Sequence, residues 1–452
     1  MSDSVISHAG GVFAPGHLGE LTRVVPFEMV DAALAACGGR QQRVRLLPSR
    51  VVVYLLLAGA LFAGQGWGQV WSRLTASLPG VWAAPAGSSL TQAMRRVGIA
   101  PLRELFDLLK GPVATTARHT ARFAGRLVVA IDGTTIAVPD TGANRAVFPK
   151  TACGPNGPAG YPLLRVVAIV ACGTRSVIDA VFGTDAVGEL TYARDLSGAL
   201  HRGMLLLADR NFATTAFTGA VAAAGADFLI RAKTGSRARR LPVQQRLADG
   251  SFLSHIAGLP VRVIEATITA RSADGTTQTG HYRLITTLLD PHEAPAITLV
   301  RLYHQRWEIE TAYLELKSTI LGGRVLRAQH PAAVIQETWA LLTAYQVLRT
   351  AMADALLHRP DLDPDRASLT IALNTARDQI THAAAITTDL TDLIGRIGTA
   401  ILSALLPNRR PRIRARVIKR AISKYRAATR TPDRRTRDAT INIQIHNLTP
   451  EA

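Results

Sequence analysis

The sequence predicts a mixed α/β core placed between helical regions, and three observations carry that prediction. Short runs rich in Val, Ile and Leu, typical of buried strands, concentrate between residues 127 and 289. Longer apolar runs of helical length lie before residue 120 and after residue 295. Hydrophobic residues make up 48% and charged residues 19% of the 452 residues, which excludes global disorder. At about 150 residues per domain, this length indicates two to four domains.

The N-terminal part is expected to be helical. Its helix-like runs are 27–36, 49–63, 89–96 and 101–109, the last with Pro101 at an early helical position. Short basic helices of this kind could enter a DNA groove, and a packing domain that is merely basic is an equally good interpretation. The uncharged stretch 51–72 is nominally long enough to span a membrane, but its Gly- and Gln-rich second half favours a buried helix.

The expected core contains strands and helices in alternation. A β-rich run over 127–132 continues through 133–139, and further strands are expected at 164–171 and 177–182. The remaining expected core elements are a helix at 188–201, a strand at 204–208 that ends at Asp209, a helix at 214–224 and a strand at 227–231.

Residues 233–290 are expected to form a β-rich insertion. The runs 261–269 and 282–289 are β-branched or alternating, and Asp274-Gly275 between them is a turn signal. A long helix is then expected over 295–321, ended by Gly322-Gly323, and another over 332–357. The expected regions are therefore 1–122 (helical), 123–232 with 291–350 (core), 233–290 (β-rich insertion) and 351–452 (helical and basic).

The charge balance indicates a polyanionic partner. There are 52 Lys and Arg against 33 Asp and Glu, a formal charge of +19, so nucleic acid is the first expectation and an anionic membrane the second. Between Arg409 and Arg437 there are thirteen Lys or Arg and one acid, Asp433. A solvated tail is the plain interpretation, and contact with a DNA backbone is the favoured one.

The cysteines and the N-terminal residues indicate a reducing compartment. Cys37, Cys153 and Cys172 are far apart and form no Cys-x-x-Cys pair, which excludes a disulfide scaffold and a zinc site built on cysteine pairs. No secretory signal is visible in the first residues. We therefore expect a cytoplasmic protein.

One segment carries four chemically active residue types on a single helical stripe. At 100° per residue, a helix through this segment places all four within a 60° arc, with Glu308 and Glu315 on the opposite face. A DNA backbone lying along the stripe could touch cations on both sides of its carboxylate. The plain alternative is a surface helix with an i,i+4 ion pair between Arg306 and Glu310. The four residues are Tyr303, Arg306, Glu310 and Lys317.

Two aspartates are candidates to join Glu310 at a metal site. Asp132 lies in the first β-rich run and Asp209 ends a buried strand, where a carboxylate is costly unless it is hydrogen-bonded or bound to metal. Hard divalent cations require several oxygen ligands, so one Glu alone is not enough. Each aspartate could equally be a strand-end cap. The competing strand-adjacent acids, ranked lower because they lie beside turns or within hairpins, are Asp140, Asp179 and Asp227.

These motifs resemble the three blocks of the DDE transposases of the insertion sequence 4 family. The blocks are Asp132-Gly-Thr, Ala208-Asp209-Arg-Asn-Phe and Tyr303-x2-Arg306-x3-Glu310-x6-Lys317. They occur in the expected order, and the long gap before Glu310 fits a β domain inserted there. The resemblance extends over about residues 20–350, because the helical N-terminal segments are also similar to that family.

The resemblance implies a ribonuclease H-like core that binds two Mg²⁺ ions, for which Mn²⁺ may substitute, through Asp132, Asp209 and Glu310. It implies that Tyr303, Arg306 and Lys317 hold the DNA phosphates. The activity would be cleavage at element ends and strand transfer into target DNA. The partners would be double-stranded DNA, comprising the terminal inverted repeats and the target, and a second copy in a homodimeric synapse at the bacterial nucleoid.

Two alternatives and one departure from the family remain. The alternatives are a non-catalytic DNA-binding repressor derivative and a ribonuclease H-type nuclease without strand transfer. The departure concerns relatives that form a DNA hairpin, which place an aromatic side chain of the β insertion against a flipped base. No Trp lies within 210–300 here, and the side chains that could substitute are Phe212, Phe228, Phe252 and Tyr282.

Overall fold

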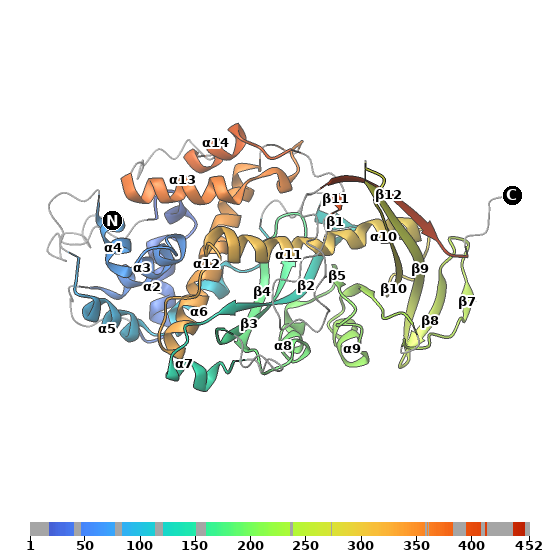
Figure 1. The fold of residues 1–452 in the computed structure, drawn as a ribbon, viewed down its shortest axis with the longest axis horizontal. Helices are drawn as coiled ribbons and strands as arrows, with labels where there is room; N and C mark the ends of the chain where they lie inside the picture. The colour runs from blue at the N-terminus through green and yellow to red at the C-terminus, as the bar shows by residue number, and fades with distance from the viewer. Residues whose placement is uncertain are drawn as a thin grey trace.

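A computed structural model gives the fold of the chain (Figure 1). It describes residues 18–39, 47–76, 84–113, 121–150, 160–235, 238–272, 274–357, 359, 361–382, 395–407, 412–413 and 437–447. Most of the basic stretch 409–437 therefore lies outside the described residues, and so do Cys153 and Asp433.

A mixed sheet forms the centre of the molecule, as the sequence predicts. Its order is β11-β12-β9-β10-β6-β5-β2-β3-β4, with β1, β7 and β8 paired at its side. β2, β5 and β6 run parallel to one another, and the other neighbours are antiparallel. The strands are β1 (Arg122–Phe123), β2 (Arg126–Ala137), β3 (Leu163–Ala171), β4 (Val177–Thr184), β5 (Met204–Ala208), β6 (Asp227–Arg231), β7 (Gln245–Arg246), β8 (Phe252–Ile256), β9 (Leu259–Ser272), β10 (Thr277–Thr286), β11 (Arg412–Ile413) and β12 (Arg437–Ile445).

Helices cover both faces of this sheet. Successive side chains of a strand point to opposite faces, and the buried strands are apolar on both, so each face needs a covering layer. Along β2, Val128 and Ala130 pack with the large helical body, whereas Val129 and Ile131 pack with α8 and α9 on the other face. The helices beside the sheet are α7 (Gly142–Val147), α8 (Glu189–Asp195), α9 (Thr215–Ala223), α10 (Ala296–Leu302) and α11 (Trp307–Leu314). The result is a layered α/β core (Figure 1).

The N-terminal helices pack with the helices after the core into one apolar body. Helix α3 lies at its centre, and every residue from Val51 to Leu61 is buried, which confirms the prediction of a buried helix for this uncharged run. In the part of the chain that the structure describes, no helix has the length and apolarity needed to cross a membrane. The helices are α2 (Phe27–Ala36), α3 (Ser49–Leu61), α4 (Trp67–Thr75), α5 (Gly87–Val97), α6 (Ala100–Leu109), α12 (Pro331–Ala355), α13 (Leu369–His382) and α14 (Gly395–Ser403).

The C-terminal region requires a correction. Helices α13 and α14 agree with the helical region expected there, but β12 is a strand that pairs antiparallel with β9. Its sequence alternates Ile441, Ile443 and Ile445 with polar residues, which is the period of a strand. Ile443 and Ile445 pack against the core, so β12 buries apolar surface and covers the open edge of β9.

The β-rich insertion continues the core sheet, because β10 pairs antiparallel with β6. Arg262 on β9 is fully buried and ties the insertion to the start of α10. It pairs with Asp249, and it donates to Ser251 Oγ at 2.8 Å and to Ala294 O at 2.7 Å. Asp249 in turn accepts from the backbone N–H of Ala296, the first residue of α10, at 2.9 Å. One buried guanidinium therefore fixes where the segment after the insertion begins.

We expect Arg262→Leu to lower the free energy of unfolding by about 3–5 kcal/mol, because it leaves Asp249 and buried carbonyls without their donor. Urea unfolding of the full chain measures this loss. Arg271→Leu, which replaces an exposed arginine of the same strand, is the control and is expected to change stability by less than about 0.5 kcal/mol. Equal losses in both variants would contradict the anchoring role of Arg262.

Candidate active site

Asp132 lies within β2, and Asp209 directly follows the neighbouring parallel strand β5 at the same level. The register of β2 and β5 places Ala130 opposite Leu207, so two residues further along each strand the pair is Asp132 and Asp209. Neighbouring strands are about 4.8 Å apart. The sequence spacing does not predict this register. The sequence did identify both aspartates, because each ends an apolar run typical of a buried strand.

The backbone holds both aspartates in place. Asp132 Oδ1 accepts from the N–H of Gly133 at 2.8 Å, and its carbonyl accepts from the Tyr313 hydroxyl at 2.6 Å. Asp209 Oδ1 accepts from the N–H of Asn211 at 2.7 Å. The Tyr303 hydroxyl donates to Ala208 O at 3.1 Å, directly before Asp209. Hydrogen bonds from the 303–320 segment therefore reach both acid-bearing strands.

Arg306 forms ion pairs with both Glu310 and Asp132. Its Nη2 lies 3.0 Å from Glu310 Oε1 and its Nη1 lies 3.4 Å from Asp132 Oδ2. The Arg306–Glu310 pair is the i,i+4 ion pair that the sequence predicts, and it also bridges to the core strand. Lys317 Nζ donates to Thr134 Oγ1 at 3.1 Å, two residues beyond Asp132. Of the predicted site residues, Arg306 and Lys317 thus contact residues of β2, and Glu310 is linked to β2 through Arg306.

The segment that carries these residues follows the path of the predicted helix but is not regular. After α10, Tyr303–Arg306 is a 3₁₀ turn, α11 runs over Trp307–Leu314, and Glu315–Ile320 is a π-helix. The prediction of one α-helix is therefore wrong in detail. Positive φ angles at Gly322 (61°) and Gly323 (71°) end the segment where the sequence predicts.

The back of this segment is held by a buried ionic network. As predicted, Glu308 and Glu315 point away from Glu310. Arg175, with 3% of its side chain exposed, donates to Glu308 Oε2 at 2.7 Å and to Glu315 Oε1 at 3.0 Å. It also pairs with Asp365, and Arg349 pairs with Glu315. The sequence gives no signal for Arg175, because its partners are more than 130 positions away.

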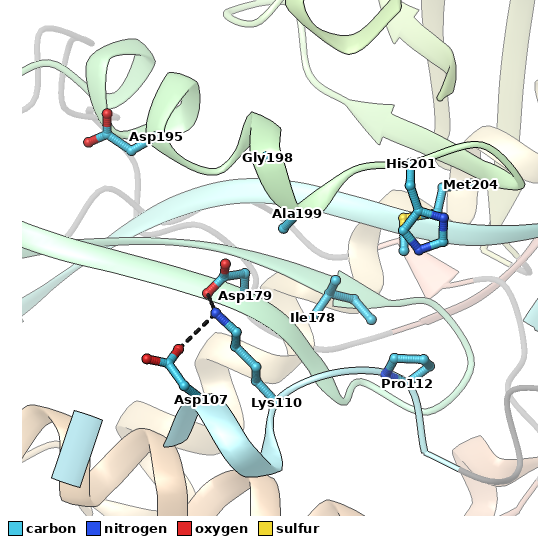
Figure 2. A pocket seen from close by; sticks show the side chains of 10 residues that line it. All are labelled: Asp107, Lys110, Pro112, Ile178, Asp179, Asp195, Gly198, Ala199, His201 and Met204. Carbon is cyan, nitrogen blue, oxygen red and sulfur yellow. Dashed lines mark hydrogen bonds and ion pairs between the residues drawn. The ribbon is translucent and has the colours of Figure 1, made fainter. Parts of the chain in front are cut away.

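The competing acids are engaged elsewhere. Asp140 pairs with Arg145 and Lys150, Asp179 with Lys110, and Asp227 with Arg126. Asp179 lines a cavity of about 540 Å³ in which Lys110 Nζ bridges Asp107 and Asp179 at 2.8 and 3.0 Å (Figure 2). This cavity includes Met204, the first residue of β5, whereas Asp209 follows the last residue of that strand. It is therefore at the other end of the sheet from the candidate site.

Burial and neighbouring acids make the Asp132 site electrostatically strained. The pKa of the Asp132 carboxyl is raised to about 7, chiefly by burial; the charges of Glu189 and Asp209 add to this rise, and the Gly133 N–H and Arg306 oppose it. Glu189 is a residue that sequence reasoning missed, since an acid at the first position of α8 is ordinary for a helix start. Within the described residues, no three Asp, Glu, His or Cys side chains converge closely enough to hold one ion.

Two family models match the chain. The model for the insertion element 4 transposase N-terminal region matches residues 15–107, and the model for the transposase DDE domain matches residues 123–347, which contain all six predicted site residues. The chain belongs to the IS4 family of DDE transposases. It is a DNA transposase of the DDE type with a ribonuclease H-like core, and DDE domains are generally dependent on divalent metal.

The chain is also similar to individual proteins. The chain is 28% identical over 410 residues to the transposase InsG for insertion sequence element IS4 of Escherichia coli K12, covering 89% of this chain and 92% of that protein. It is 24% identical over 190 residues to the putative transposase InsZ of the same organism, covering 42% of this chain and 62% of that protein. The piggyBac transposase synaptic complex with hairpin DNA matches with a TM-score of 0.44 and 12% identity, over 85% of this chain and 83% of that one.

The raised pKa of Asp132 predicts a pH-dependent effect of Asp132→Asn in metal-free protein. The folded chain retains a proton that the unfolded chain releases from its ordinary pKa of 3.8, so stability falls as pH rises until about pH 7. The amide side chain of the variant does not titrate, so the variant does not lose stability in this way as pH rises. We expect the stability of the variant relative to wild type to rise by about 2–3 kcal/mol between pH 5 and pH 8, measured by urea unfolding in EDTA. A relative stability that is independent of pH would contradict the buried, strained carboxyl.

Proposed function

We propose that Asp132, Asp209 and Glu310 form the catalytic centre of this transposase and hold two Mg²⁺ ions, which Mn²⁺ can replace. The observation that supports it best is the common level of Asp132 in β2 and Asp209 directly after the parallel strand β5, with Arg306 bridging Asp132 to Glu310. The chemistry of the donors fits, because they are hard carboxylate oxygens in half-buried positions. The Arg306 guanidinium already places positive charge between two of these acids. Bound ions would activate the attacking hydroxyl and stabilise the leaving oxygen.

The reaction is two successive in-line phosphoryl transfers. Water attacks the phosphorus at the element end, the bond to the 3′ oxygen breaks, and a 3′-hydroxyl and a 5′-phosphate result. The 3′-hydroxyl then attacks a target phosphodiester, so one P–O bond forms as another breaks and no external energy is required. This agrees with a sequence that lacks a Gly-x4-Gly-Lys-[Ser/Thr] nucleotide loop.

We assign the cations of the 303–317 segment to the DNA backbone. Arg306 and Lys317 lie beside Asp132 and Thr134, so a phosphate at the carboxylates would meet a guanidinium fork and an ammonium. Tyr303 has a different position from the one expected. It is 7% exposed and its hydroxyl donates to Ala208 O, so we propose that it positions the strand end before Asp209.

Of the four aromatic side chains considered for base stacking, three are buried: Phe212, Phe228 and Phe252. Tyr282 is only partly buried and its ring centroid lies 6.4 Å from that of Tyr303, next to the centre. The guanidinium of Arg231 lies 4.0 Å from the same ring centroid. We infer that any stacking of a flipped base by the insertion uses Tyr282.

The remaining proposals concern the partners. We propose that the helical region 1–122 and the basic region 351–452 bind the terminal inverted repeats, that the core 123–232 with 291–350 also engages target DNA, and that a homodimer pairs two ends at the nucleoid in the cytoplasm. The insertion 233–290 extends the core sheet toward the same DNA. Nothing in the structure favours the non-catalytic repressor derivative, since all three carboxylates are present. A strand-transfer assay with a precut end distinguishes a transposase from a nuclease that only cuts.

We expect Asp132→Asn, Asp209→Asn and Glu310→Gln each to retain binding of a labelled element-end duplex and to lose cleavage by about 10³-fold. Loss of one metal-binding carboxylate removes several kcal/mol of transition-state stabilisation. Gel-shift and nicking assays on the same preparations measure both properties. Asp195→Asn, an exposed acid of α8, is the control and should cleave normally. Retained cleavage in any of the three variants would remove that residue from the catalytic centre.

A further inference from the structure

We propose that Glu189 is a fourth carboxylate of the catalytic centre, which positions Asp209 through Asn211 and adds its charge to the cation site. This inference rests on the proposed function. Glu189 is the first residue of α8, on the face of the sheet opposite the 303–320 segment. It therefore approaches Asp132 and Asp209 from a different side than Arg306 and Glu310 do.

The first observation is the contact between Glu189 and the backbone of β2. A Cβ on Gly133 would overlap Glu189 Oε1 and lie 3.0 Å from its Cδ, so a larger residue cannot occupy position 133 without displacing the carboxylate. Gly133 follows Asp132 directly and lies within the regular strand. The backbone angle there is ordinary, and a Cβ at this position would displace the flexible end of the Glu189 side chain.

The second observation is the bridge made by Asn211. Its backbone N–H donates to Asp209 Oδ1 at 2.7 Å, and its side-chain Nδ2 donates to Glu189 Oε2 at 2.7 Å. One residue therefore joins the two carboxylates from adjacent elements. Because Asn211 follows Asp209 by two positions, a movement of the Glu189 carboxylate would also move Asn211 and change the orientation of Asp209.

The third observation is the charge balance around the site. Asp132 and Glu310 share Arg306, whereas the contacts found for Glu189 and Asp209 in the described part of the chain are with the amides of Asn211. Four carboxylates therefore lie near two cations, Arg306 and Lys317, so negative charge exceeds positive charge among these residues. A favourable interaction with the N-terminus of α8 accounts for an acid at position 189, but it accounts neither for the approach of its carboxylate to Gly133 nor for the Asn211 bridge.

Binding of Mn²⁺ to the full-length chain tests the assignment. Electron paramagnetic resonance distinguishes free from bound Mn²⁺, so it gives affinity without a cleavage assay. We expect Glu189→Gln to weaken Mn²⁺ binding by about tenfold or more, as loss of a supporting residue around a metal site does. Gln retains the acceptor for Asn211, so the variant isolates the charge. Asp195→Asn removes an equal charge from the same helix and should bind Mn²⁺ as wild type does.

A second variant tests the contact itself. Gly133→Ala should displace the Glu189 carboxylate and weaken Mn²⁺ binding to a similar degree. Because both changes would remove one interaction, the double variant Gly133→Ala with Glu189→Gln should bind Mn²⁺ no more weakly than the weaker-binding single variant. Additive losses would show that position 133 acts independently of Glu189, which would overturn the assignment.

The triad variants separate the two hypotheses. If Asp132→Asn, Asp209→Asn and Glu310→Gln abolish Mn²⁺ binding while Glu189→Gln matches wild type, the assignment of Glu189 is overturned and the proposed function stands. If the triad variants also bind Mn²⁺ as wild type does, the proposed catalytic centre fails, and the role of Glu189 fails with it.

Discussion

The burial of a carboxylate beside other carboxylates is the constraint on which the arrangement of the core depends. Burial, with smaller contributions from the charges of Glu189 and Asp209, raises the pKa of Asp132 to about 7, and Arg306 links Glu310 to the same carboxylate. Gathering carboxylates in a half-buried site costs free energy unless positive charge offsets it. Arg306 supplies part of this charge, and the remainder is what divalent cations and the cations that hold DNA would neutralise.

A site of this kind must be held by structure that does not itself need the cation. The 303–320 segment is fixed from behind by the Arg175 network, which binds Glu308 and Glu315 on the face opposite Glu310. From the front, Tyr313 and Tyr303 bind the backbone of β2 and the end of β5. Arg262 and Asp249 fix the start of α10. Buried charge pairs and backbone hydrogen bonds thus offset the repulsion at the centre.

The sequence predicted what depends on local pattern. The apolar runs around Asp132 and Asp209 identified the strands, and the 303–317 spacing placed Glu310 opposite Glu308. What depends on contacts between remote residues could not be predicted: the network of Arg175, the bridge from Asn211 to Glu189, and the 3₁₀ and π turns around α11. The strand β12 was not predicted, because the basic residues of 409–437 determined the interpretation of the whole C-terminal region. The alternating isoleucines of β12 do have the period of a strand.

Anomalous diffraction from crystals of the full chain, bound to element-end DNA and soaked in Mn²⁺, tests the central claim most directly. We predict anomalous peaks within about 2.5 Å of carboxylate oxygens of Asp132, Asp209 and Glu310. Peaks elsewhere, or three carboxylates that remain too far apart to share an ion when DNA is bound, would contradict it.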